Sequence, residues 1–194
     1  MGADDADAQL LRAHARGDPH AFGDLLARYR SRIVQLVRCR VGAGSLWVED
    51  VAQDVFVQVH RKAATFEGRS SVKTWLYAVA INVCRDHQRR ERRAPQAVPV
   101  PIDVAEPLAE LPDASLDPLE RLEQEERHRL VREALESLSP PHRTLLYMRD
   151  REDMSYEQMA DALAVPVGTV RSRLHNARAA LAHALEQTMR GLRT

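Results

Sequence analysis

The stretch MSYEQMADALAVPVGTVRSRLHNAR, residues 154–178, has the pattern of two helices joined by a tight turn. Ser155 stands where a helix N-cap is expected, and Gln158, three residues later, completes a capping box. Pro166 has a fixed φ and no N–H, so it closes the first helix and suits the start of the second. The stretch therefore predicts a helix-turn-helix, an element that enters the DNA major groove in many proteins.

The second helix of this pair is predicted to be apolar on one side and polar on the other. Its apolar positions recur at steps of three and four: Val170, Leu174, Ala177, Leu181 and Leu185. Arginine bonds guanine bidentately, asparagine bonds adenine, and serine bonds either base. The side chains that would face outward include donors of these kinds: Arg171, Ser172, His175 and Asn176.

A solvated face on a helical hairpin is the plainer interpretation of such charges. Residues 162–194 contain five arginines and one acidic residue, Glu186, which leaves a local charge of +4. This excess favours a surface that meets DNA.

Composition predicts an all-α chain, because alanine, leucine, arginine and glutamate dominate while glycine and β-branched residues are sparse. With 194 residues, the chain is long enough for two small domains, each with its own modest core. The net charge of zero hides segregation. Residues 1–93 hold 16 basic and 11 acidic residues, a charge of +5. Residues 94–119 hold no basic and five acidic residues (−5), and residues 120–161 hold seven basic and eleven acidic residues (−4). Separate charged blocks indicate several distinct contacts.

Periodicity and breakers divide the chain into three parts. Helices are expected at about residues 7–16, 19–41, 47–64 and 72–93, after a frayed start over residues 1–6. Six prolines interrupt residues 94–119, which are predicted to form a flexible acidic linker. Helices at 118–138 and 140–149 then precede the helix-turn-helix. The predicted division is therefore a first helical domain at residues 1–93, a linker at residues 94–119 and a second helical domain at residues 120–194.

Several function classes find no support in the sequence. No segment is apolar enough to cross a membrane and no secretory signal opens the chain, so a cytoplasmic protein is expected. Cys39 and Cys84 are expected to be reduced thiols, in the core or half-exposed, with a disulfide switch as the weaker alternative. The histidines lack metal-ligand spacing, and no phosphate-binding loop or nucleophile elbow is found. We expect no metal, no cofactor and no enzymatic activity.

Three stretches in series resemble an extracytoplasmic-function sigma factor, the smallest class of the bacterial sigma-70 family. VEDVAQDVFVQVHRKAATFEG, residues 48–68, is similar to region 2.2 of that family, and SSVKTWLYAVAINVCRDHQRRERR, residues 70–93, is similar to regions 2.3 and 2.4. Residues 135–181 are similar to region 4. The resemblance covers about half of the chain, and it implies a protein that binds core RNA polymerase and directs it to promoters.

The resemblance assigns roles to individual residues. One exposed helix face would meet the basic β′ clamp of polymerase, through Glu49, Asp50, Gln53, Asp54 and Phe56, and region 4 would meet the β flap. A base of the −10 element would be captured by the loop at residues 66–72, with Phe66, Arg69 and Ser71 as candidates. Promoter DNA would also be met by Asn82, Arg85, Arg89 and Arg90. Trp75 and Tyr77 resemble stacking platforms, although Trp75 shares the apolar face of its helix and is expected in the core.

For the −35 element, the positions nearest base edges are Arg171, Ser172 and Asn176. Backbone contacts or helix supports are implied for Arg173, His175 and Arg178. Asn176 departs from the family, where arginine is common, so the base preference at this position stays open. Ala164 stands where the turn often has glycine, which a non-glycine residue occupies at modest strain.

Other interpretations stay open beside this one. A LuxR-type regulator would use the same C-terminal helices without polymerase, but it would need a sensory domain that is usually α/β. A helical adaptor would make no sequence-selective DNA contact. The acidic linker is either an anionic strand that occupies a channel of polymerase or a passive tether. Many relatives are held inactive by an anti-sigma partner, and the linker would allow this.

Overall fold

The computed structural model describes residues 3–42, 44–93 and 118–191. Over these residues the protein contains helices and no strand, which confirms the all-α prediction. The linker prediction falls mostly on residues 94–117, outside the described part. The N-terminal half contains α1 (Ala3–Ala15), α2 (Pro19–Val41), α3 (Val48–Lys62), the 3-10 turn η1 (Ala63–Thr65) and α4 (Val72–Glu91). The C-terminal half contains α5 (Pro118–Ser137), α6 (Pro140–Leu146), the π-helical turn η2 (Tyr147–Arg151), α7 (Tyr156–Leu163) and α8 (Val167–Gly191).

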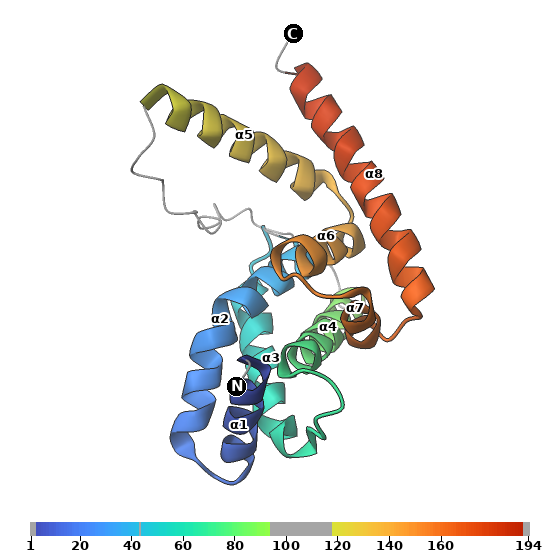
Figure 1. The fold of residues 1–194 in the computed structure, drawn as a ribbon. Helices are drawn as coiled ribbons and strands as arrows, with labels where there is room; N and C mark the ends of the chain where they lie inside the picture. Colours follow the sequence, from blue (N-terminus) through green and yellow to red (C-terminus); the bar gives the residue numbers. More distant parts are fainter. Residues whose placement is uncertain (1–2, 43, 94–117, 192–194) are drawn as a thin grey trace.

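Helix α2 lies at the centre of the N-terminal half and packs against α1, α3 and α4 (Figure 1). Its start is fixed by Asp18, whose carboxylate accepts hydrogen bonds from the backbone N–H groups of His20 and Ala21. Its end is fixed by Gly42, whose φ of 105° is costly for residues with a Cβ. The face between these ends is apolar at helical spacing and fully covered, at Leu25, Ile33, Leu36 and Val37.

The first helix begins earlier than the sequence predicted. A frayed start over residues 1–6 was expected, but α1 already begins at Ala3. Asp7 explains this difference, because its buried carboxylate accepts hydrogen bonds from Arg28 and Tyr29 of α2. A charge buried with its partners anchors the helix, and residues more than 20 positions away supply those partners.

The predicted helix-turn-helix is present as α7 and α8. The side chain of Ser155 accepts a hydrogen bond from the Gln158 N–H, and the Gln158 side chain accepts one from the Ser155 N–H, which confirms the capping box. Ala164 has φ 55° and ψ 51°, so a non-glycine residue does take the left-handed position of the turn. Pro166 directly precedes α8.

The segment before this motif differs from the continuous helix expected to residue 149. Helix α6 ends at Leu146, and the chain continues as the wider turn η2. The N–H groups of Glu152 and Met154 bond the carbonyls of Tyr147 and Met148, which accommodates the widening. Tyr147 and Met148 are thereby buried.

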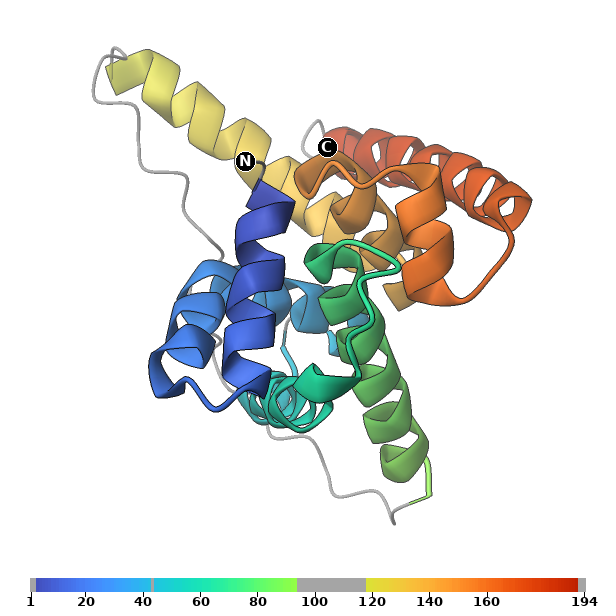
Figure 2. The same ribbon diagram turned by 60° about the horizontal axis from the view of Figure 1, so that its bottom comes forward.

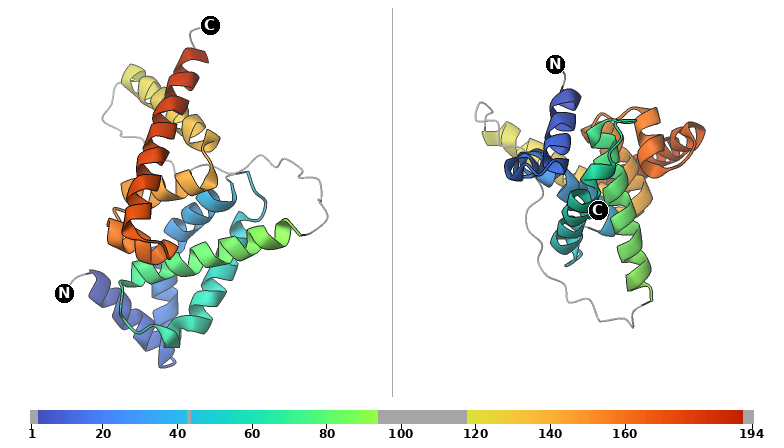
Figure 3. Two further views of the ribbon diagram at one scale, coloured as in Figure 1. Left: turned by 90° about the vertical axis from the view of Figure 1, so that its right-hand side faces the viewer. Right: turned by 90° about the horizontal axis from the view of Figure 1, so that it is seen from below.

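The two halves lie against each other instead of standing apart. Helix α6 packs on α2 and α7 packs on α4, so that α4 runs between the two groups of helices (Figures 2 and 3). The buried apolar residues form one cluster that passes through both halves, where two separate cores were expected. This union depends on the apolar face of α6 and η2, which the sequence alone could not assign to a partner. No helix among the described residues is long and apolar enough to cross a membrane.

Both cysteines are free thiols that the fold shields. Cys84 is buried and Cys39 is half-buried, and burial raises the pKa of Cys39 to about 11 and that of Cys84 to about 12. Because the pKa of each thiol is higher in the folded state, stability is unaffected at neutral pH and falls as pH rises from the ordinary thiol value of about 9 toward these values.

We expect both thiols to resist alkylation by iodoacetamide at pH 8 in the native protein and to react quickly in denaturant. The raised pKa leaves far less of Cys39 as the reactive thiolate at pH 8. Mass spectrometry of the labelled protein checks this result. Rapid native labelling at either position would instead support the redox-switch alternative.

Candidate nucleic-acid interface

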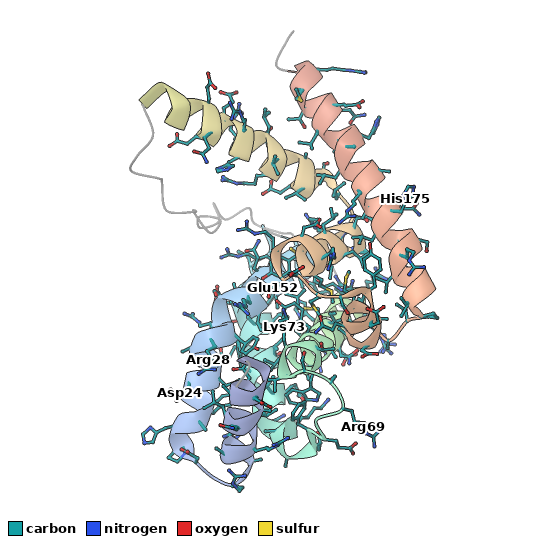
Figure 4. All side chains as sticks on the ribbon, in the orientation of Figure 1. Asp24, Arg28, Arg69, Lys73, Glu152 and His175 are labelled. Atoms are coloured by element: carbon teal, nitrogen blue, oxygen red, sulfur yellow. The ribbon has the colours of Figure 1, made fainter. Side chains whose placement is uncertain are left out.

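Helix α8 presents its polar face to solvent, as the helix-turn-helix pattern predicted. Val170, Leu174 and Ala177 are buried against the rest of the C-terminal half. The side chains predicted to read or hold the −35 element are exposed: Arg171, Ser172, Arg173, His175, Asn176 and Arg178. Figure 4 shows His175 on the side of α8 that faces away from the other helices.

Three of these residues already have partners within the chain. Arg178 donates to Asp150 of η2 at 2.9 Å, which joins α8 to the π-helical turn. Ser172 donates to the carbonyl of Thr169 at 3.1 Å, so its lone pairs remain for an incoming donor. The Arg171 guanidinium lies 5.9 Å from the centre of the Tyr156 ring. Arg178 therefore has an acidic partner within the chain.

The loop predicted to capture a −10 base contains one exposed cation and two residues that also stabilise the fold. Arg69 is 86% exposed and forms an ion pair with Glu67 at 2.6 Å. The Phe66 ring packs edge-on against Trp75, 5.5 Å between centroids. Ser71 is the N-cap of α4 and accepts a hydrogen bond from the Thr74 N–H. The loop therefore has a fixed base, and Arg69 projects from it (Figure 4).

Helix α4 carries a cationic exposed surface toward its C-terminal end. The four residues predicted to face promoter DNA are all exposed: Asn82, Arg85, Arg89 and Arg90. Arg85 donates to the side-chain oxygen of Asn82 at 3.2 Å, and Arg89 lies 3.8 Å from Asp86. These pairs are exposed and weak, so phosphates can displace them.

The two aromatic residues of α4 do not both suit base stacking. Tyr77 is fully buried, so it contributes to the core and has no face for a base. Trp75 is half-buried and packs on the core cluster, as expected.

Helix α3 presents the residues predicted to meet polymerase. Four of them are exposed along one side of the helix: Glu49, Asp50, Gln53 and Asp54. Phe56 is half-buried and packs against the core, so it contributes more to the fold than to a free surface. Exposed Trp47 and Val57 lie at the two ends of this acidic stretch.

A polar network that the sequence did not predict joins the two halves. Lys73 of α4 donates to the backbone carbonyl of Glu152 at 2.7 Å (Figure 4). The Tyr147 hydroxyl lies 3.0 Å from each of two acceptors, the carbonyl of Arg32 and the carboxylate of Glu152. It donates its single proton to one of them at a time. Arg32 lies 3.9 Å from the same carboxylate. Burial and the charge of Glu152 raise the pKa of Tyr147, so it remains a neutral donor.

The described residues contain no group of three histidine, cysteine or acidic side chains placed to hold a metal ion. Helices α4 and α8 each carry several exposed arginines. Such an arrangement can bind an extended polyanion.

Two family models match this chain. The model of Sigma-70 region 2 matches residues 25–94, and the model of Sigma-70, region 4 matches residues 128–181. The first range includes α3, the loop and α4, and the second includes the helix-turn-helix.

Curated relatives match along nearly the whole chain. The RNA polymerase sigma-H factor of Pseudomonas aeruginosa is 35% identical over 98% of this chain and 99% of its own length. The ECF RNA polymerase sigma-E factor of Escherichia coli strain K12 is 32% identical over 95% of this chain and 96% of its own.

Solved structures share the arrangement of helices. CnrH in complex with the cytosolic domain of CnrY matches with a TM-score of 0.63 and 25% identity, over 94% of this chain and 98% of that one. The sigma factor RpoE of Bartonella quintana, in complex with the anti-sigma factor NepR, matches with a TM-score of 0.66 and 23% identity, over 86% and 98%.

Proposed function

Because this chain belongs to the extracytoplasmic-function sigma factors of the sigma-70 family, we propose that it binds core RNA polymerase and directs it to promoters. It recognises the −35 and −10 elements and promotes melting of the DNA. The polymerase supplies the chemistry of transcription, and this protein selects the start site.

One observation carries the proposal: a single chain exposes a recognition helix in one half and a cationic helix beside a loop in the other. A regulator that acts without polymerase needs only the first of these. The N-terminal half is helical and matches a sigma region 2 model, which leaves the LuxR-type alternative without the sensory domain that it requires.

In the C-terminal half, Arg171, Ser172 and Asn176 read base edges of the −35 element from the exposed face of α8. Arg173 and His175, on the same face, hold the DNA backbone. Arg178, which pairs with Asp150 at the surface, supports α8 or contacts the DNA backbone.

In the N-terminal half, Arg69 and the loop beneath it receive a base of the −10 element. Extraction of a base from the duplex costs a few kcal/mol, which stacking and edge contacts return. Phe66 and Ser71 hold the loop in shape through Trp75 and the α4 N-terminus. Asn82, Arg85, Arg89 and Arg90 follow the strand backbone along α4.

Two proteins are the expected partners besides DNA. Core polymerase would bind the acidic side of α3 through its β′ clamp and the C-terminal half through its β flap. An anti-sigma factor is the second, since a similar solved sigma factor is bound to one. The two halves are joined by the hydrogen bond from Lys73 to Glu152. Binding of either partner can stabilise this joined arrangement or one in which the halves are apart.

Run-off transcription tests the proposal directly. Purified core polymerase is given a library of promoter sequences with and without this protein, and transcript starts are sequenced. We expect new start sites that share −35 and −10 sequences at a fixed spacing. Unchanged start sites, or failure of the protein to bind core polymerase, would overturn the proposal.

The salt dependence of promoter binding should depend on the α4 arginines. Substitution of both Arg89 and Arg90 by alanine should make the slope of log K against log salt less negative, by about 0.7 to 0.9 for each phosphate that is no longer neutralised. The measurement is holoenzyme binding to a fluorescent promoter between low and high salt. The matched control replaces Arg127 and Arg129, two exposed arginines of α5 that pair with acids on their own helix, and should leave the slope unchanged.

A further inference from the structure

Tyr156 is the first residue of α7, where the helix-turn-helix begins, and it lies between Arg149 of η2 and Arg171 of α8. It is half-buried and packs against the core cluster. Two cations approach its ring: the guanidinium of Arg171 at 5.9 Å from the ring centre and that of Arg149 at 5.7 Å. A cation within about 6 Å of an aromatic ring is attracted by the negative potential of its face.

We propose that Tyr156 is a positioning residue for Arg171, which it holds in the orientation that distinguishes base pairs of the −35 element. This inference rests on the proposed function, because it deepens the role given there to Arg171. Tyr156 itself need not touch DNA.

The position of the ring is fixed from the side of η2. Arg149 donates to the backbone carbonyl of Met154 at 2.8 Å and lies 3.5 Å from the carboxylate of Asp153. Arg149 is therefore anchored by a backbone atom and an acid while it contacts the ring. A ring held in this way offers Arg171 a defined surface instead of a mobile one.

The electrostatics around Arg171 support the same role. A helix N-terminus is a poor place for a cation, because the helix dipole is positive there, and Arg171 lies beside the N-terminus of α7. The pKa of Glu157, the next residue of that helix, is lowered by hydrogen bonds at the helix start and further by the charge of Arg171. The face of the Tyr156 ring and the carboxylate of Glu157 are the negative groups beside Arg171 at this position.

Orientation matters because an arginine has many rotamers, and only a few of them place its fork against a guanine edge. Ordering such a side chain on binding costs free energy, and a side chain that is already oriented avoids part of this cost. The advantage is greatest for the base pair that the fork bonds bidentately. Loss of the ring should therefore weaken discrimination at that base pair more than it weakens DNA binding overall.

The test compares Tyr156→Leu with Tyr156→Phe in reconstituted holoenzyme, on a library randomised in the −35 element. Arg171→Ala first identifies the base pair that Arg171 reads. Tyr156→Leu should lower the preference at this base pair about two- to fivefold, as expected for an exposed cation–π contact, and leave the other positions unchanged. Tyr156→Phe keeps the ring and should retain the preference. The double variant Tyr156→Leu/Arg171→Ala should lose no more preference than Arg171→Ala alone.

A uniform loss across all −35 positions in Tyr156→Leu would show a structural role only and overturn this inference. The inference is also overturned if Tyr156→Leu retains full preference at the base pair that Arg171→Ala identifies. If Arg171→Ala itself changes no −35 preference, then the proposed reading of the −35 element by α8 has failed, independently of Tyr156.

Discussion

Replacement of Arg171 by alanine is expected to weaken recognition of the −35 element by about 1–3 kcal/mol, roughly 5- to 150-fold. Arg171 is exposed near the start of α8, where a recognition helix contacts base edges. Its fork can donate two hydrogen bonds to one guanine, and alanine donates none. Electrophoretic mobility shift with holoenzyme on matched and mismatched −35 sequences measures the loss.

The matched control is Arg190→Ala, which removes the same charge from the far end of the same helix. Arg190 is exposed in the last turn of α8, away from the helix-turn-helix. This variant should bind all −35 sequences as the parent protein does. Equal losses in the two variants would mean that α8 contributes only general positive charge and reads no sequence.

Reversal of charge at Asp54 is expected to weaken binding to core polymerase by about 2–5 kcal/mol. Asp54 is exposed in the middle of α3, and the β′ clamp that this helix would meet is basic in the family that the chain resembles. Arginine at this position places like charges opposite each other, which costs several kcal/mol at an interface. Titration of labelled core polymerase with Asp54→Arg measures the affinity.

Asp24→Arg is the control for this second experiment. Asp24 is likewise an exposed acid, but it lies on α2 (Figure 4), on a different helix from the predicted docking face. The Asp24→Arg variant should bind polymerase with nearly unchanged affinity. If Asp24→Arg loses as much as Asp54→Arg, then net charge and not the face of α3 governs binding. Circular dichroism of both variants should match the parent protein, since exposed substitutions rarely change stability by more than about 0.5 kcal/mol.

Features that depend on neighbours along the chain could be predicted before the fold was known. Apolar residues at steps of three and four placed the buried and exposed faces of α8, because those residues lie on one side of any helix. The capping box at Ser155 and the break at Gly42 were equally readable, since each acts within four residues. The exposed site residues on α3 and α8 follow from the same periodicity.

Features that depend on residues far apart in the chain emerged only with the packing of the helices. Tyr147 bonds the carbonyl of Arg32 across 115 positions, and Lys73 bonds that of Glu152 across 79. No local pattern encodes these pairs, because they exist only once α6 and α7 pack on α2 and α4. Tyr77 is buried in the cluster that this packing forms. The packing of α7 on α8 brings Tyr156 to Arg171. Local propensity sets the elements and their faces, whereas shape and polar complementarity between faces set which of them meet.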